Sequence, residues 1–127
     1  MATSTSHAPA HRRIVWGVRA FLILAFTVAG VAKLAGAPQM IEVFEAIGIG
    51  QWFRYLTGAV EVIGALLLLK RATGFLGGLA LAMTMICGAA THLLLIGGNP
   101  VPAMILATLS AFVAWQLRPL SLFSAAS

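Results

Sequence analysis

The chain has 127 residues, enough for one domain, and 61% of them are hydrophobic whereas only 9% are charged. A soluble domain carries roughly 25% charged residues, so the composition excludes a soluble fold of this length and predicts a membrane protein. The net charge of +5 would suggest nucleic-acid binding in a soluble protein, but here the basic residues lie mainly at the edges of apolar segments, so no nucleic-acid partner is expected.

The first apolar segment covers residues 14–35. Residues 1–13 before it are small, polar and basic, and we expect them to form a disordered tail. The apolar segment is long enough to cross a bilayer as a helix, because about 20 residues span its ~30 Å core. It is also too long for a cleaved signal peptide, so we interpret it as a transmembrane helix. Arg19 lies one turn inside this helix, and we expect its side chain to extend to the cytoplasmic surface.

A shorter and more polar segment follows over residues 39–47. Its apolar residues recur at helical spacing on one face, and its two glutamates lie on the opposite face. The apolar face consists of Met40, Val43, Phe44 and Ile47, and the polar face of Glu42 and Glu45. We predict a short amphipathic helix in the membrane interface, with Pro38 at its start and Gly48 at its end.

Three further apolar segments predict helices over about residues 52–69, 72–97 and 101–117, followed by a short tail over residues 119–127. Turns divide them at Lys70 and Arg71 and at residues 97–100. The predicted fold class is therefore all-α: a polytopic membrane protein whose residues 14–118 form a four-transmembrane-helix bundle, with a short interfacial amphipathic helix between helices 1 and 2. Aromatic residues near the helix ends are expected interfacial anchors, namely Trp16, Trp52, Tyr55 and Trp115.

The basic residues are distributed unequally between the two ends of this predicted bundle. Six fall on the side that holds both termini, and two fall on the other side. The first set is Arg12, Arg13, Arg19, Lys70, Arg71 and Arg118, and the second is Lys33 and Arg54. This bias predicts a multi-pass protein of the plasma (inner) membrane with both termini in the cytoplasm.

Glu61 is the most unusual residue of the apolar segments. A carboxylate inside a membrane costs several kcal/mol unless it is protonated or paired. Helical rise places Glu61 roughly 10 Å below Arg54 and His92 roughly 6 Å below the end of its own helix, with Lys33 near the same edge. We therefore predict a buried polar site of Glu61, His92, Lys33 and Arg54, which is either a structural ion pair or a ligand site or proton relay.

Other chemistry finds little support in the sequence. Cys87 is the only cysteine, which excludes an intramolecular disulfide and a two-cysteine redox relay. The chain contains no aspartate and no cluster of metal-ligating residues, so no metal site is expected. A quinone is the one cofactor that we consider.

The order and spacing of many residues resemble the DoxX-like family over roughly residues 18–118. The first half of the resemblance is carried by Lys33, Leu34, Gly36, Phe44, Gly48, Trp52, Arg54, Tyr55, Gly58, Glu61 and residues 64–67, and the second half by Gly88, Ala89, His92, Leu93, Pro102 and Ala103. The resemblance implies a small four-helix integral membrane protein. It also implies that Glu61, Lys33, Arg54 and His92 match the family's polar motif.

Three functions remain open at this point. Because founding relatives of the family accompany a thiosulfate:quinone oxidoreductase, the resemblance implies a small subunit or accessory factor of a membrane redox system that uses quinone. The alternative is a non-enzymatic scaffold or assembly factor, whose polar layer is structural and whose partner is a membrane-embedded protein or another copy of the chain. A small proton-coupled transporter is the third hypothesis, and whether the protein is an enzyme stays open.

Overall fold

The structure is a computed structural model that describes residues 2–119 and 121, with side chains from residue 9 onward. It is all-α, as predicted, and the described residues contain no strand. The helices are α1 (Ala2–Ala35), α2 (Pro38–Ile47), α3 (Trp52–Leu67), α4 (Arg71–Thr91) and α5 (Val101–Gln116). A π-helical turn, η1 (His92–Ile96), continues α4.

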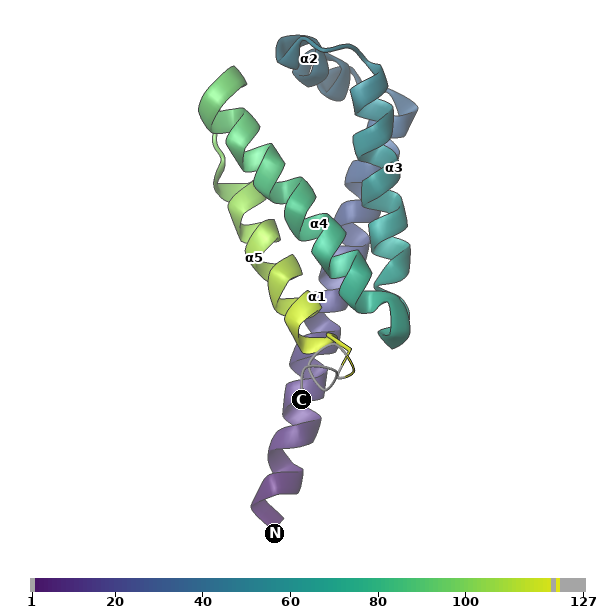
Figure 1. Cartoon of the computed structure of the whole chain (residues 1–127), viewed down its shortest axis with the longest axis vertical. Helices are drawn as coiled ribbons and strands as arrows, with labels where there is room; N and C mark the ends of the chain where they lie inside the picture. Colours follow the sequence, from purple (N-terminus) through teal and green to yellow (C-terminus); the bar gives the residue numbers. More distant parts are fainter. Residues whose placement is uncertain (1, 120, 122–127) are drawn as a thin grey trace.

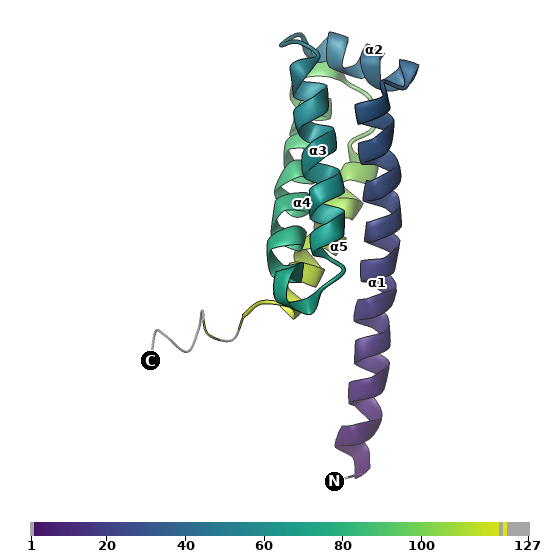
Figure 2. The ribbon, with the colours of Figure 1, turned by 90° about the vertical axis from the view of Figure 1, so that its right-hand side faces the viewer.

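The four longer helices lie side by side, and α2 lies across one end of them (Figure 1). The helix α4 packs along both α3 and α5, and α1 packs along α3. The first turns of α1 extend beyond the other helices, at the end of the bundle where α5 also finishes (Figure 2). The start of α1 and the end of α5 therefore both lie at the end of the bundle opposite α2.

The start of α1 differs from the sequence-based expectation, because the helix begins at Ala2 and includes residues that were expected to be a disordered tail. A contact with the end of α5 and a buried side chain lie within this additional part of the helix and just after it. His11 Nε2 lies 2.7 Å from Gln116 Oε1, and the side chain of Val15 is buried. From these anchored turns the helix continues toward the N-terminus, since each added residue forms a backbone hydrogen bond once a helix exists. The predicted tail over residues 119–127 lies mostly outside the described residues.

Glycines allow close contact between neighbouring helices. A Cβ atom at Gly30 of α1 would lie 2.8 Å from the carbonyl oxygen of Gly58 in α3. A Cβ atom at Gly77 of α4 would lie 2.7 Å from the carbonyl oxygen of Gly64, also in α3. Any larger residue at these positions would separate the helices, so small residues set the spacing of α1, α3 and α4, as expected for helices packed in lipid.

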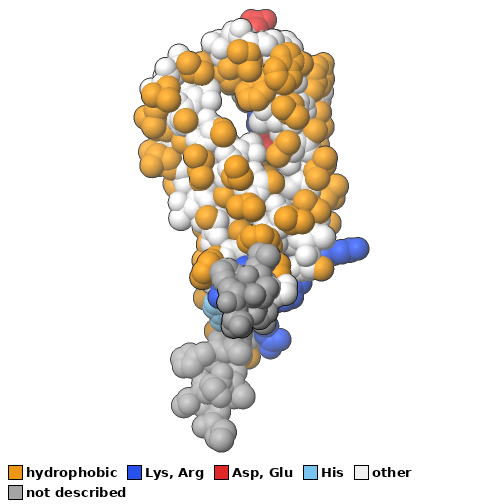
Figure 3. All heavy atoms as spheres, in the orientation of Figure 1, with side chains coloured by type: hydrophobic (Ala, Val, Ile, Leu, Met, Phe, Trp, Pro, Cys, Tyr) orange, Lys and Arg blue, Asp and Glu red, His pale blue; other side chains and the backbone are white. Residues whose placement is uncertain are grey.

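Most apolar side chains of the long helices face outward. The segments Pro9–Ala35 and Arg71–Ile96 are long and apolar enough to cross a membrane, yet only 28% and 17% of their most apolar windows are buried inside the protein. A core helix of a soluble protein would be mostly buried. Figure 3 shows hydrophobic side chains spread over the whole height of the bundle. The buried core is small and consists of Leu22, Phe26, Ala65, Leu68, Leu81, Val113 and Leu117.

The short helix α2 begins at Pro38, one residue before the start of the segment 39–47, and its two glutamates are exposed. Pro38 occupies its first turn, and Gly48 ends it with a positive φ of 87° while its N–H donates to the carbonyl oxygen of Phe44 (3.2 Å). Phe44 is buried and contacts the ring of Phe53 in α3 edge-on, with the centroids 5.8 Å apart. The apolar face of α2 is therefore turned toward the bundle, and it covers the cavity described below.

Candidate functional site

An ion pair between Lys33 and Glu61 lies inside the bundle. Lys33 Nζ is 2.7 Å from Glu61 Oε1, and the two side chains are 14% and 1% exposed. The carboxylate of Glu61 is thus almost completely removed from the surroundings of the protein. Since burying one unpaired charge in an apolar medium is strongly unfavourable, the pair lowers the cost of keeping each partner there.

Packing of α1 against α3 brings these two residues together. A Cβ atom at Gly58 would lie 3.0 Å from Lys33 Cβ and from the carbonyl oxygen of Gly30, so Lys33 lies level with Gly58 on the antiparallel helix. Side chains of a helix lean toward its N-terminus. Lys33 therefore leans toward the level of Gly30, and Glu61 leans in the opposite direction to meet it.

The carboxylate of Glu61 is incompletely satisfied. Apart from its ion pair with Lys33, neither of its oxygens accepts a hydrogen bond from a described residue. A buried carboxylate ordinarily accepts several hydrogen bonds, because unmet hydrogen-bonding capacity costs free energy. Glu61 Oε2 in particular is buried and has no hydrogen-bond partner among the described residues.

A largely apolar cavity of about 570 Å³ adjoins this pair. Its walls come from all five helices and include Lys33 of α1, Glu61 of α3 and His92 of η1. Figure 3 shows the hollow in the half of the bundle nearest α2, with basic and acidic atoms visible inside it. The cavity is of a size that accommodates small organic ligands. Its apolar lining includes Met40, Val43, Phe44, Ile47, Phe53, Leu56, Val60, Met83, Met85 and Leu106.

Arg54 does not join Glu61, in contrast to the sequence-based prediction. It is 5% exposed and donates to the carbonyl oxygen of Lys33, in the last turn of α1, and to Gln51 Oε1 at 2.7 Å. Its guanidinium also lies over the ring of Tyr55, 4.4 Å from the centroid. The last carbonyls of a helix lack partners within the helix, so Arg54 satisfies one of them and compensates the negative end of the helix dipole.

Arg19 makes the equivalent contact at the other end of the same helix pair. Its Nε and Nη2 donate to the carbonyl oxygen of Leu68 at 3.0 and 2.6 Å, just past the end of α3. The residue is 3% exposed, so the expectation that it extends to the surface is wrong. Each of the antiparallel helices α1 and α3 thus supplies an arginine that binds the C-terminal carbonyls of the other.

His92 lines the cavity, but its ring is engaged elsewhere and it does not pair with Glu61. Its Nδ1 lies 2.8 Å from the carbonyl oxygen of Gly97, and since a carbonyl can only accept, Nδ1 is the donor. The π-helical turn that starts at His92 and the positive φ of 73° at Gly97 bring this carbonyl within reach. His92 therefore caps the C-terminal end of its own helix.

A comparison with protein families matches the description "DoxX-like family" to residues 17–116. The chain belongs to the DoxX-like family. No curated protein and no solved structure matches it. Together with the two long, outward-facing apolar helices, the family makes this chain a membrane protein.

The aromatic residues that were expected to anchor this DoxX-like protein all have exposed side chains. Trp16 and Trp115 are 51% and 57% exposed and carry the guanidiniums of Arg19 and Arg118 over their rings. Trp52 and Tyr55, which are 59% and 51% exposed, lie at the start of α3, beside α2. The four residues thus form two groups, one at each end of the bundle.

Thr57 and Thr84 also line the cavity of the DoxX-like protein, although the sequence indicated only that they take part in helix packing. Their hydroxyl groups bind carbonyls of their own helices, as in Thr57 to Phe53 and Thr84 to Ala80, both at 2.8 Å. The signal that could have found them is their spacing. Thr57 lies one turn before Glu61 on α3, and Thr84 lies on the same row of α4 as Gly88 and His92, so each row of small and polar residues continues into the predicted polar site.

Proposed function

We propose that this DoxX-like protein is a four-span, multi-pass protein of the inner membrane with both termini in the cytoplasm. The helices α1 and α4 have the length of ordinary spans, whereas α3 and α5 have 16 residues each. Such helices are about 24 Å long, which a bilayer accommodates by local thinning or by interfacial anchors at their ends. The unequal distribution of basic residues supports the orientation.

We further propose that the protein is a small subunit or accessory factor of a redox system in the membrane and that it binds a quinone beside Lys33 and Glu61. The observation that carries this proposal is the unpartnered Oε2 of a buried carboxylate that lines an apolar cavity of about 570 Å³. A quinone combines an apolar body with carbonyl oxygens, so its chemistry fits this combination of walls.

Different residues of the cavity would make different contributions to quinone binding. A bound quinone would be reduced to the quinol by two electrons from the proposed membrane redox system, with uptake of two protons. The ammonium group of Lys33 would donate a hydrogen bond to a carbonyl oxygen, and Glu61 would hold or release a proton near that oxygen. The apolar face of α2, with Met40 and Phe44, would exclude water from the head group.

A binding titration tests the quinone proposal. The purified full-length protein is titrated with a short-chain, fully substituted quinone, and the same is done with Glu61→Gln and with Glu45→Gln. Glu45 is exposed on α2 and does not line the cavity, so its variant is a matched control. We expect saturable binding that Glu61→Gln weakens about tenfold, which corresponds to about 1.4 kcal/mol, and that Glu45→Gln leaves unchanged. Equal binding by both variants would refute the proposal.

The second candidate function is a non-enzymatic scaffold or assembly factor. It is favoured by the location of Lys33 and Glu61 beside the close contact of Gly30 and Gly58, where an ion pair would fix the register of α1 and α3. The partner would then be a membrane-embedded protein or a second copy of the chain, in contact with the outward apolar faces. Cross-linking in native membranes followed by identification of the products tests this function, and an exclusively monomeric, uncross-linked protein would count against it.

A further inference from the structure

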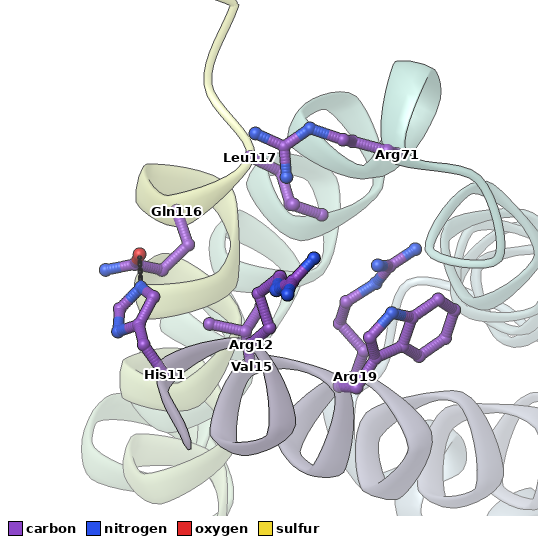
Figure 4. Close-up of a pocket in the computed structure, with 8 residues that line it drawn as sticks. His11, Arg12, Val15, Arg19, Arg71, Gln116 and Leu117 are labelled. Carbon is purple, nitrogen blue, oxygen red and sulfur yellow. Dashed lines mark hydrogen bonds between the residues drawn. The ribbon is translucent and has the colours of Figure 1, made fainter. Parts of the chain in front are cut away.

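A second cavity, of about 660 Å³, lies at the other end of the bundle. It opens where the early turns of α1 pass the start of α4 and the end of α5. Its polar wall consists of His11, Arg12, Arg19, Arg71 and Gln116. Figure 4 shows Arg12 and Arg19 extending from α1, and Arg71 extending from the start of α4, into the same space.

The charge of this basic cavity is not compensated by the chain's acidic side chains. Three guanidinium groups line it, whereas the three glutamates of the sequence, Glu42, Glu45 and Glu61, lie elsewhere and none lines the wall. Arg19 and Arg71 are close enough for their charges to interact unfavourably. Like charges brought together without a counter-charge favour an anion between them.

Parts of the wall are held in place before any ligand arrives. Both hydrogen bonds that Arg19 makes, through Nε and Nη2 to the carbonyl oxygen of Leu68, fix its guanidinium in a 3% exposed position. His11 is tied to Gln116 across the gap between α1 and α5. A preordered guanidinium loses less entropy on binding an anion, and arginine binds phosphate oxygens with paired donors.

We propose that the basic cavity binds the phosphate group of an anionic phospholipid. The assignment to a lipid rests on the proposed membrane placement, which puts the cavity at the cytoplasmic boundary of the bilayer. The exposed ring of Trp16 lines the same cavity, as expected where a protein meets lipid head groups. The cytoplasmic leaflet carries anionic lipids, and basic pockets between helices on that side bind their head groups. A soluble phosphate compound shares the same chemistry, so the test must separate the two sources.

Lipid binding to the purified full-length protein, measured by native mass spectrometry, tests the proposal. The probes are phosphatidylglycerol, phosphatidylcholine and inorganic phosphate. Arg12→Gln and Arg71→Gln each remove one charge from the wall, and Arg13→Gln removes a neighbouring exposed charge that does not line the cavity. Arg19 is left intact because it also caps α3.

We expect Arg12→Gln and Arg71→Gln each to weaken phosphatidylglycerol binding about fivefold, which corresponds to about 1 kcal/mol for one basic residue near a membrane surface. Arg13→Gln should weaken this binding less than either of them. An equal effect of all three variants would overturn the site. Displacement of the lipid by inorganic phosphate at comparable concentration would overturn the lipid assignment. Neither Arg12 nor Arg71 lines the cavity beside Glu61, so Arg12→Gln and Arg71→Gln should leave quinone binding unchanged, and a failure here is distinguishable from a failure of the quinone proposal.

Discussion

Lys33 and Glu61 approach one another from opposite directions across the contact between Gly30 and Gly58. Lys33 lies level with Gly58 and leans toward Glu61, and the salt bridge of 2.7 Å closes the gap between them. The close backbone contact and the ion pair therefore depend on each other. Changes to either should be detectable in the stability of the α1–α3 pair.

Replacing Lys33 with methionine should be strongly destabilising. Lys33→Met leaves the buried carboxylate of Glu61 without its counter-charge, so we expect the free energy of unfolding to fall by about 3–5 kcal/mol. The double variant Lys33→Met with Glu61→Gln removes both charges and should recover much of that loss. Thermal unfolding of the purified protein measures all variants.

Lys70→Met is the matched control for this prediction, because Lys70 is exposed in the turn between α3 and α4. Exposed substitutions usually change stability by less than about 0.5 kcal/mol. If Lys33→Met unfolded at the same temperature as Lys70→Met, the ion pair would be energetically irrelevant and the account of Glu61 would be wrong.

The contact of Gly30 with α3 gives a second prediction, for which Gly17 on the same helix is the control. A Cβ atom at Gly30 would lie 2.6 Å from Val62 Cγ2, whereas one at Gly17 would meet nothing within 4 Å. Gly30→Ala should therefore destabilise the protein by about 1–3 kcal/mol, as overpacking does, and Gly17→Ala should be neutral or stabilising by up to about 1 kcal/mol. Chemical unfolding of the two variants side by side distinguishes them, and equal behaviour would mean that α1 and α3 do not touch at Gly30.

The helices could be predicted from the sequence to within a few residues, apart from the start of α1, because lengths of apolar runs and turn residues such as Gly48 are local signals. The partner of Glu61 could not be chosen among Lys33, Arg54 and His92. Helical rise gives the depth of a residue but not the direction of its side chain. Arg54 and His92 instead bind carbonyl oxygens at helix ends. Such backbone acceptors cannot be identified from the residue types in the sequence.

The same limitation explains Arg19. A single arginine one turn inside an apolar helix could be expected only to reach the membrane surface, since its acceptor, the carbonyl oxygen of Leu68, belongs to a residue 49 positions away. The cavity was also not predictable, because it arises from the packing of five helices. A row of small and polar residues on a helix, such as Thr84 and Gly88, occurs both where helices pack closely and where they line a cavity, so it does not distinguish the two.

The proposed orientation predicts which loops are accessible from outside the cell. In a Cys87→Ala background, Asn99→Cys should react with a membrane-impermeant thiol reagent on intact cells, because Asn99 is exposed in the turn after η1. Lys70→Cys, exposed in the opposite turn, should react only after the membrane is permeabilised. The reverse pattern would invert the topology, and labelling of both sites on intact cells would contradict a sealed four-span arrangement.

Filling the cavity should weaken quinone binding without unfolding the protein. Gly88 lines the cavity, and a Cβ atom there would meet only Ala103 Cβ at 3.9 Å, an ordinary contact distance. Gly88→Leu should therefore place its side chain in the cavity and weaken quinone binding at least about tenfold. Titration with the short-chain quinone measures this change, with Gly17→Leu on α1 as the control. Full affinity in Gly88→Leu would place the ligand elsewhere.

Protection of Cys87 is the most direct measurement of quinone binding beside Glu61. Cys87 is the only cysteine of the chain, is exposed and lines the cavity, so its alkylation rate reports on occupancy of the cavity in the natural sequence. We predict that a fully substituted short-chain quinone slows alkylation of Cys87 in the wild-type protein and that Glu61→Gln requires about tenfold more quinone for the same protection. An alkylation rate that does not change at saturating quinone would contradict the account.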